Sequence, residues 1–191
     1  MGFITEPKDT PCQNGIFCLG IKLPNEYPFD GPRIKFLTKI WHPNVNMTTG
    51  VICFNNLEKQ WASAMTLEKA LITIQSLLSE CELDETQEPT VARQLVNDFD
   101  LFERTARHWT YFYAMGDSQS PTNRVLVDRE FKFKLKRLID MGCCDEERAL
   151  VLLSSNMWNL DKVIMIFKSS ILNDISQFRR WRQLFISVHA S

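Results

Sequence analysis

Apolar and polar residues alternate with the period of a β-strand in the first part of the chain and with the period of an α-helix in the rest. This change of period divides the chain into a strand-and-loop zone and helical zones. An apolar run rich in β-forming residues covers Ile16–Leu23, and Arg33–Leu37 alternates apolar with polar residues, so both predict strands. A Pro-, Gly- and Asn-rich stretch at 24–32 predicts a rigid connection between them. Residues 39–64 show little periodicity but contain large apolar side chains, which predicts a packed, irregular loop of the kind that carries active sites.

A helical period begins after Thr66, a plausible N-cap. Apolar residues then recur three and four positions apart and form one stripe, made of Leu67, Leu71, Ile74 and Leu78. Five acidic residues follow within Glu80–Glu88. Further helices are predicted at 91–96 and 99–115, the second with an apolar face at Phe102, Ala106, Trp109 and Tyr113.

The last third of the chain predicts a second, small domain. Residues 128–170 fit three short helices, the first of them ended by Gly142 as a left-handed cap. A linker composition at 116–127 precedes them, and 171–191 fits one more amphipathic helix. We therefore expect a domain at 1–115, a linker at 116–127, a helical domain at 128–170 and a helical tail at 171–191.

Composition narrows the classes of function. The chain has 22 Lys and Arg against 23 Asp and Glu, a balance that argues against a nucleic-acid partner. No apolar run approaches the roughly 20 residues that span a bilayer, and no secretory signal opens the chain, so we expect no membrane partner. The six cysteines lack Cys-x-x-Cys or zinc-finger spacing, which predicts reduced thiols and no metal site. We expect the cytoplasm as the compartment, and the nucleus as a second one.

The irregular loop offers one candidate for covalent chemistry. Cys53 follows an apolar pair, and Asn44 stands nine residues before it behind Pro43. A thiol can hold an acyl group as a thioester, and an amide N–H can stabilise the negative oxygen of a tetrahedral intermediate. The alternative is that Cys53 is a small core residue and His42 a hydrogen-bonded structural one.

Several linked motifs in this zone resemble those of ubiquitin-conjugating enzymes. They are Tyr27-Pro28-Phe29, His42-Pro43-Asn44-Val45, Gly50-x-Ile52-Cys53, Gln60-Trp61 and Ala106-Arg107-x-Trp109. Residues 128–170 are similar to a ubiquitin-associated domain. The resemblance implies an α+β fold, with an antiparallel sheet and helices but without the family's opening helix and first strand, followed by a three-helix bundle. Lacking that helix, residues 1–191 are expected to take up ubiquitin poorly.

The resemblance also implies residue roles. Cys53 would carry ubiquitin as a thioester and pass it to a lysine, building polyubiquitin chains, while Asn44 would support the loop and the oxyanion. Asn55 stands where the family often has an Asp, so Asp84 and Glu85 would supply the acidic group; an ordinary solvated loop is the alternative. His42, Pro43 and Asn55 would brace the loop. No cofactor is expected, because ATP is used by the upstream activating enzyme.

Two partner surfaces follow from the same resemblance. Ubiquitin ligases would dock on Phe29, Ala62, Ser63 and Ala64, unless Phe29 belongs to the core. Ubiquitin would bind the last domain through Met141, Gly142, Cys143, Ile166 and Phe167, weakly because Cys143 replaces an aromatic residue. The alternative is a bundle that only packs against the first domain. The expected partners are ubiquitin, its activating enzyme, ligases and protein substrates.

Two other functions fit parts of the pattern. A pseudo-enzyme would keep the fold and bind ubiquitin or a ligase without transferring ubiquitin. A cysteine hydrolase would use Cys53 with His42 or His108 as the base.

Overall fold

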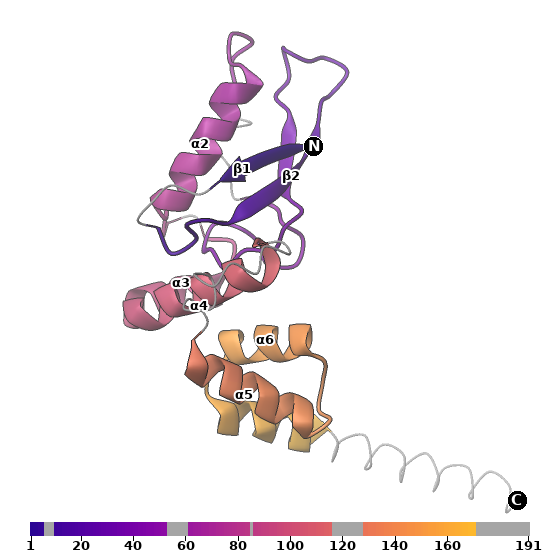
Figure 1. Cartoon of the computed structure of the whole chain (residues 1–191). Helices are drawn as coiled ribbons and strands as arrows, with labels where there is room; N and C mark the ends of the chain where they lie inside the picture. Colours follow the sequence, from indigo (N-terminus) through magenta and orange to yellow (C-terminus); the bar gives the residue numbers. More distant parts are fainter. Residues whose placement is uncertain (6–9, 53–60, 85, 116–127, 171–191) are drawn as a thin grey trace, which may run out of the picture. The chain divides into compact units, whose positions relative to one another are not determined.

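The computed structural model describes residues 1–5, 10–52, 61–84, 86–115 and 128–170, which fall into two compact units (Figure 1). The first unit spans Met1–Asp128 and the second spans Arg129–Ser191. The predicted linker at 116–127 and the predicted tail helix at 171–191 lie outside the described residues.

The first unit contains an antiparallel sheet in the order β1-β2-β3, formed by Gly2–Thr5, Ile16–Lys22 and Arg33–Phe36. Side chains alternate between the two faces of a strand, and here Phe17 and Leu19 point to the buried face. Their partners in register, Ile4 and Phe36, are buried with them. The two strands predicted from the sequence are confirmed, and each ends one residue earlier than expected.

Helix α2, Leu67–Ser79, lies beside this sheet (Figure 1). The Thr66 side chain accepts the Lys69 N–H at 3.2 Å, so the predicted N-cap is confirmed. Within the predicted apolar stripe Ile74 and Leu78 are buried and the other two leucines are half-buried. The Gln75 amide donates to the Thr5 carbonyl at 2.5 Å, which ties the helix to the end of β1.

Helices α3, Pro89–Asn97, and α4, Phe99–Tyr113, meet at Asp98. The Asp98 carboxylate accepts the Leu101 N–H at 3.0 Å and so caps α4. Three of the four residues predicted for its apolar face are buried, and Tyr113 is half-buried. Just after α4, the Ala114 carbonyl accepts the Ile16 N–H at 3.0 Å, which fixes the helix against the start of β2.

The irregular stretch after β3 is held against the sheet at Gly50. Its carbonyl accepts the Phe36 N–H at 2.8 Å, and its own N–H donates to Asn46 at 2.8 Å. Gly50 has φ +70°, and a Cβ there would lie 1.9 Å from the Phe36 carbonyl oxygen. Only glycine satisfies both conditions. Beyond this turn, Val45 and Ile52 form an antiparallel bridge.

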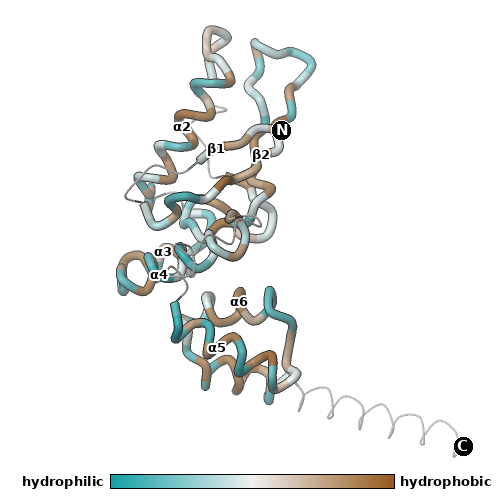
Figure 2. The backbone as a smooth tube through the Cα atoms, in the orientation of Figure 1, coloured by the Kyte–Doolittle hydropathy of each residue, from teal (hydrophilic) through white to brown (hydrophobic). Residues whose placement is uncertain are grey.

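Within residues 128–170, the described part of the second unit has three helices: α5, Arg129–Asp140; α6, Glu146–Ser155; and a third at Leu160–Ser170. Figure 2 shows apolar positions along α5 separated by hydrophilic ones, the pattern of a helix with one buried face. Phe131 on that face stacks on Trp158 with ring centroids 3.5 Å apart.

Gly142 ends α5 as predicted. Its φ is +68°, its N–H donates to Ile139, and the Cys143 N–H donates to Leu138. These two bonds form a Schellman motif, which satisfies carbonyls at the end of the helix.

Within the described residues no single helix has the length and apolar content to cross a membrane, and one pair bent by 113°, α6 with Leu160–Ser170, meets the criteria by length and composition only.

Two phenylalanines of α5 provide a matched test of the bundle. Phe131 is fully buried, whereas Phe133 is 64% exposed two residues later. We expect Phe131→Ala to destabilise the second unit by about 3–4 kcal/mol, because it removes a stacked ring from a small core. Phe133→Ala should change stability by less than about 0.5 kcal/mol. Urea unfolding of the full chain, followed by backbone NMR signals of α5 and α6, measures both; equal effects would contradict the described core.

Candidate active site

Five consecutive buried residues, Trp41 to Val45, form the floor of the candidate site, and we call them the buried strip. The Trp41 indole donates to the Gln94 side-chain oxygen on α3 at 2.7 Å and packs on Trp109 of α4 with centroids 5.0 Å apart. The strip has no regular secondary structure, so these side-chain contacts with two helices fix its path.

Asn44 uses both ends of its side-chain amide on one distant residue. Its Nδ2 donates to the Glu82 carbonyl at 2.6 Å, and its Oδ1 accepts the Glu82 N–H at 3.0 Å. Asn44 is fully buried, and both bonds reach across 38 residues of sequence. A paired donor and acceptor of this kind fixes both the position and the orientation of the Glu82 backbone.

Glu82 belongs to the loop between α2 and α3, and Pro43 and Glu88 hold the far end of this loop. The Pro43 carbonyl accepts the N–H groups of Gln87 and Glu88 at 2.8 and 3.0 Å, while the Glu88 carboxylate accepts the Met47 N–H at 2.8 Å. The loop is therefore attached to the buried strip on both sides of Asp84, whose side chain is exposed. Its neighbour Glu85 lies outside the described residues.

His42 is buried and neutral. Its Nδ1 accepts the Asn44 N–H at 3.2 Å, so the ring carries its proton on Nε2, which lies 3.3 Å from the Cys81 sulfur. Burial lowers the pKa of His42 to about 3, against the opposite effect of a backbone hydrogen bond at Leu78. Burial also raises the pKa of the Cys81 thiol to about 11, so this thiol is a poor nucleophile.

These contacts argue against the cysteine hydrolase. Both ring nitrogens of His42 are engaged. Nδ1 accepts the Asn44 N–H and Nε2 contacts the Cys81 sulfur, so among the described residues Cys81 is the thiol that His42 contacts. His108 is 4% exposed on α4, and burial lowers its pKa to about 4. Neither imidazole is placed as a solvent-facing base.

Cys53, the predicted nucleophile, and Asn55 lie outside the described residues, as does Gln60. The described chain reaches Ile52, which is buried and bridged to Val45. The last described residue before Cys53 is thus paired with the residue that follows Asn44.

Phe29 is 80% exposed, so the alternative that it belongs to the core is wrong. Ala62, Ser63 and Ala64 are exposed as well. Trp61 joins the two loops, because its indole donates to the Pro28 carbonyl at 2.8 Å and its ring lies 6.0 Å from that of Tyr27. The four residues predicted as a ligase surface therefore stand on two loops that are connected by the half-buried side chain of Trp61.

In the second unit, Met141 is 48% and Ile166 39% exposed, while Cys143 and Phe167 are half-buried. Gly142 is exposed between Met141 and Cys143. The residues predicted to bind ubiquitin therefore include two exposed apolar side chains, one at the end of α5 and one near the end of the third helix.

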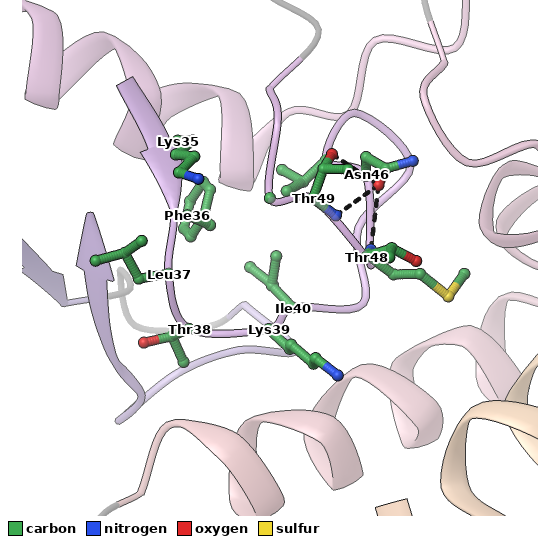
Figure 3. A pocket seen from close by; sticks show the side chains of 12 residues that line it. Lys35, Phe36, Leu37, Thr38, Lys39, Ile40, Asn46, Thr48 and Thr49 are labelled. Carbon is green, nitrogen blue, oxygen red and sulfur yellow. Dashed lines mark hydrogen bonds between the residues drawn. The ribbon is translucent and has the colours of Figure 1, made fainter. Parts of the chain in front are cut away.

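A cavity of about 200 Å³ lies beside the site, between residues 35–40 and 45–50 (Figure 3). Asn46 occupies one side, where its Oδ1 accepts the N–H groups of Thr48 and Thr49 at 3.1 and 2.8 Å. The Thr49 hydroxyl also bonds to Asn46, so these polar groups are satisfied within the loop. Among the described residues no cluster of three or more His, Cys, Asp or Glu could hold a metal ion.

Two contacts were missed by the sequence analysis. The sequence predicts Gln94 only as part of a helix, although its position three residues after Val91 marks the buried face of α3. No local sequence pattern predicts the contact between Cys81 and His42, because it joins an irregular loop to a residue 39 positions away.

The buried histidines make stability depend on pH. Each has a folded-state pKa below its unfolded value of 6.5, so the unfolded state takes up protons first and stability falls as the pH drops below 6.5. Between pH 7.5 and 5 we expect each histidine to remove about 2 kcal/mol. His42→Gln should flatten this part of the stability profile, measured by urea unfolding at several pH values, and His108→Gln should do so independently. An unchanged slope in both variants would contradict the buried, neutral state.

Comparisons with known proteins show which family the sequence of this chain is similar to. The family model described as ubiquitin-conjugating enzyme matches residues 1–110. The chain is 44% identical to the ubiquitin-conjugating enzyme E2-22 kDa of Drosophila melanogaster over 161 residues, covering 84% of this chain and 76% of that protein. It is 39% identical to the human ubiquitin-conjugating enzyme E2 K over 169 residues, covering 88% and 80%.

A solved structure extends the comparison to the fold. The E2 domain of a Toxoplasma gondii ubiquitin conjugating enzyme matches with a TM-score of 0.58 and 41% identity, covering 59% of this chain and 79% of that one. The sequence similarity over most of the chain and the structural similarity of the first unit therefore agree. The chain belongs to the ubiquitin-conjugating enzyme family.

Proposed function

We propose that Cys53 is the residue on which this enzyme carries ubiquitin. The observation that carries the proposal is the bridge between Val45 and Ile52, because it brings the chain to within one residue of Cys53 beside the strip that holds Asn44. Membership of the family supplies the reaction. The segment Gly50-x-Ile52-Cys53 resembles the family's cysteine motif, which supports Cys53 as the nucleophile.

The reaction has two acyl transfers. The Cys53 thiolate attacks the carbonyl carbon of the ubiquitin C-terminal glycine, which arrives as a thioester on the activating enzyme, and that enzyme's thiol leaves. A lysine amine then attacks the new thioester, an amide bond forms, and Cys53 departs as the thiol after the amine loses a proton. Thioester exchange is nearly energy-neutral, so the chain itself needs no cofactor; ATP is used upstream.

The amine needs a proton acceptor, and Asp84 or Glu85 is our candidate. The carboxylate of Asp84 is exposed, on a loop held to the buried strip by Asn44 and Pro43. In this proposal Asn44 acts as a positioning residue for that loop. Its Nδ2 already donates to Glu82, so an additional role at the oxyanion requires that this bond be exchanged. His42 and Pro43 complete the support, together with Asn55.

Two partner surfaces complete the proposal. Ligases would dock on Phe29 and residues 62–64, where an exposed ring stands beside small side chains. The second unit would act as a ubiquitin-associated domain, the layout of the conjugating enzyme huntingtin-interacting protein 2, which this chain resembles. A ubiquitin-binding unit attached to the conjugating domain would favour the building of polyubiquitin chains.

The nucleophile can be tested by exchanging sulfur for oxygen. Incubation with activating enzyme, ATP and ubiquitin should produce an adduct that a reductant removes. Cys53→Ser should produce a slower-forming adduct that resists the reductant, since an oxygen ester replaces the thioester. Cys81→Ser is the matched control and should behave as the unchanged chain, because the buried Cys81 thiol is a poor nucleophile. A reductant-labile adduct on Cys53→Ser, or no adduct on the unchanged chain, would contradict the assignment; the second outcome would favour the pseudo-enzyme.

Ubiquitin binding by the second unit needs a separate measurement. Titration of the isotope-labelled full chain with ubiquitin should shift the NMR signals of Met141 and Ile166. The double change Met141→Ser with Ile166→Ser should weaken binding about tenfold, equivalent to ~1.4 kcal/mol, because two apolar contacts are lost. Phe133→Ser, on another face of α5, should leave the affinity unchanged. Absence of shifts in the second unit would mean that it does not bind ubiquitin.

A further inference from the structure

An exposed face of α5 combines one aromatic ring with four cations. We call it the basic face: Arg129, Lys132, Phe133, Lys136 and Arg137, all exposed. Helical geometry places Phe133 opposite the buried stripe of Phe131, Leu135 and Leu138, so it cannot contribute to the core of the second unit. It is also outside the residues proposed to bind ubiquitin.

The charge of this face is local. Helix α5 contains five Lys and Arg against two acidic residues, whereas the whole chain has a net charge of −1. Of the two acidic residues, Glu130 pairs with Lys134 at 2.5 Å, and Asp140 lies on the basic face itself, one turn beyond Lys136, so four cations and one carboxylate surround the ring. An exposed ring surrounded by positive charge fits an acidic partner that offers an apolar side chain.

The first unit presents a surface of that chemistry. We call it the acidic segment: Glu80, Glu82, Leu83 and Asp84, all exposed, with Leu83 at 47%. Its backbone is already ordered, because both polar groups of the Glu82 peptide are bound by Asn44. Binding to it therefore costs little conformational entropy in the segment itself.

We propose that the basic face of one copy of this chain binds the acidic segment of a second copy. Phe133 would cover Leu83, and the four cations would face the three carboxylates. Every copy carries both surfaces, so the contact can form more than once in an assembly. Because the acidic segment adjoins the buried strip, the contact would place the second unit of one copy beside the candidate active site of the other.

A second copy of the chain fits the basic face better than an anionic lipid surface or a nucleic acid does. Asp140 lies within the basic face and Glu130 at its edge, so both would repel a continuous layer of phosphates, and the chain as a whole is slightly acidic. The acidic segment, by contrast, offers a limited number of carboxylates around one apolar residue.

Sedimentation equilibrium of the full chain tests the proposal. At about 0.05 M salt the average mass should rise above 22.3 kDa as the concentration increases, and at about 0.5 M salt it should return to that of the monomer. Phe133→Ser and the double change Lys132→Glu with Lys136→Glu should each weaken the association about tenfold or more. Lys168→Glu, an exposed cation on the third helix, is the matched control and should have no effect.

A charge exchange makes the test specific. The variant with Lys132→Glu, Lys136→Glu and Arg137→Glu keeps Arg129 as its single cation on the former basic face and so has two acidic surfaces. A second variant with Glu80→Lys and Glu82→Lys keeps Asp84 as its single carboxylate on the former acidic segment and so has two basic surfaces. Each alone should be monomeric, while an equal mixture should associate, since every contact in a mixed assembly again joins opposite charges. All substituted side chains are exposed, and NMR spectra of each variant check that it is folded.

Three results would overturn the proposal. They are a monomer at every concentration and salt, an association that the variants leave unchanged, and a mixture that stays monomeric. Binding of the unchanged chain to phosphatidylserine vesicles or to single-stranded DNA, lost in Phe133→Ser and without self-association, would assign the basic face to that other partner.

Discussion

The side-chain amide of Asn44 determines the shape of the candidate site. It is fully buried, and it donates to and accepts from the backbone of Glu82, so one side chain positions a loop that has no helix or strand of its own. An aspartate would keep the acceptor and lose the donor, and an alanine would remove the partners of both the Glu82 N–H and the Glu82 carbonyl. The neighbouring residues make this contact possible: His42 accepts the Asn44 N–H, and Trp41 is fixed by Gln94 and Trp109.

The site therefore has a rigid floor and an exposed rim. Buried, neutral groups lie beneath it, since burial keeps His42 uncharged and the Cys81 thiol protonated at neutral pH. The charged side chains of Glu82 and Asp84 are exposed to solvent. This separation suits a reaction whose proton acceptor has to meet an incoming amine, because the acceptor stays in contact with water while its backbone is held in place.

The sequence alone predicted the elements that have a period or a cap. The alternation of β2, the Thr66 cap of α2 and the Gly142 end of α5 each depend on a few neighbouring residues, and all three are confirmed. The motif around Asn44 falls on a strip that the structure shows to be buried, but the partner of Asn44 could not be predicted, because Asn44 binds the backbone of Glu82 and a backbone carries no sequence signal. The same holds for the exposure of Phe29: an aromatic residue in a Pro-rich turn fits a core or a surface equally well until the surrounding chain is placed.

Among the described residues, two glycines have a positive φ, and they face different restrictions on evolutionary change. At Gly142 a Cβ would meet no atom within 4 Å, so the obstacle is conformational, and asparagine, which tolerates left-handed backbone, is an accessible replacement. At Gly50 the carbonyl of Phe36 fills the space that any side chain would need. No compensating substitution nearby can clear a backbone atom, so lineages that keep this turn are confined to a single residue type at position 50.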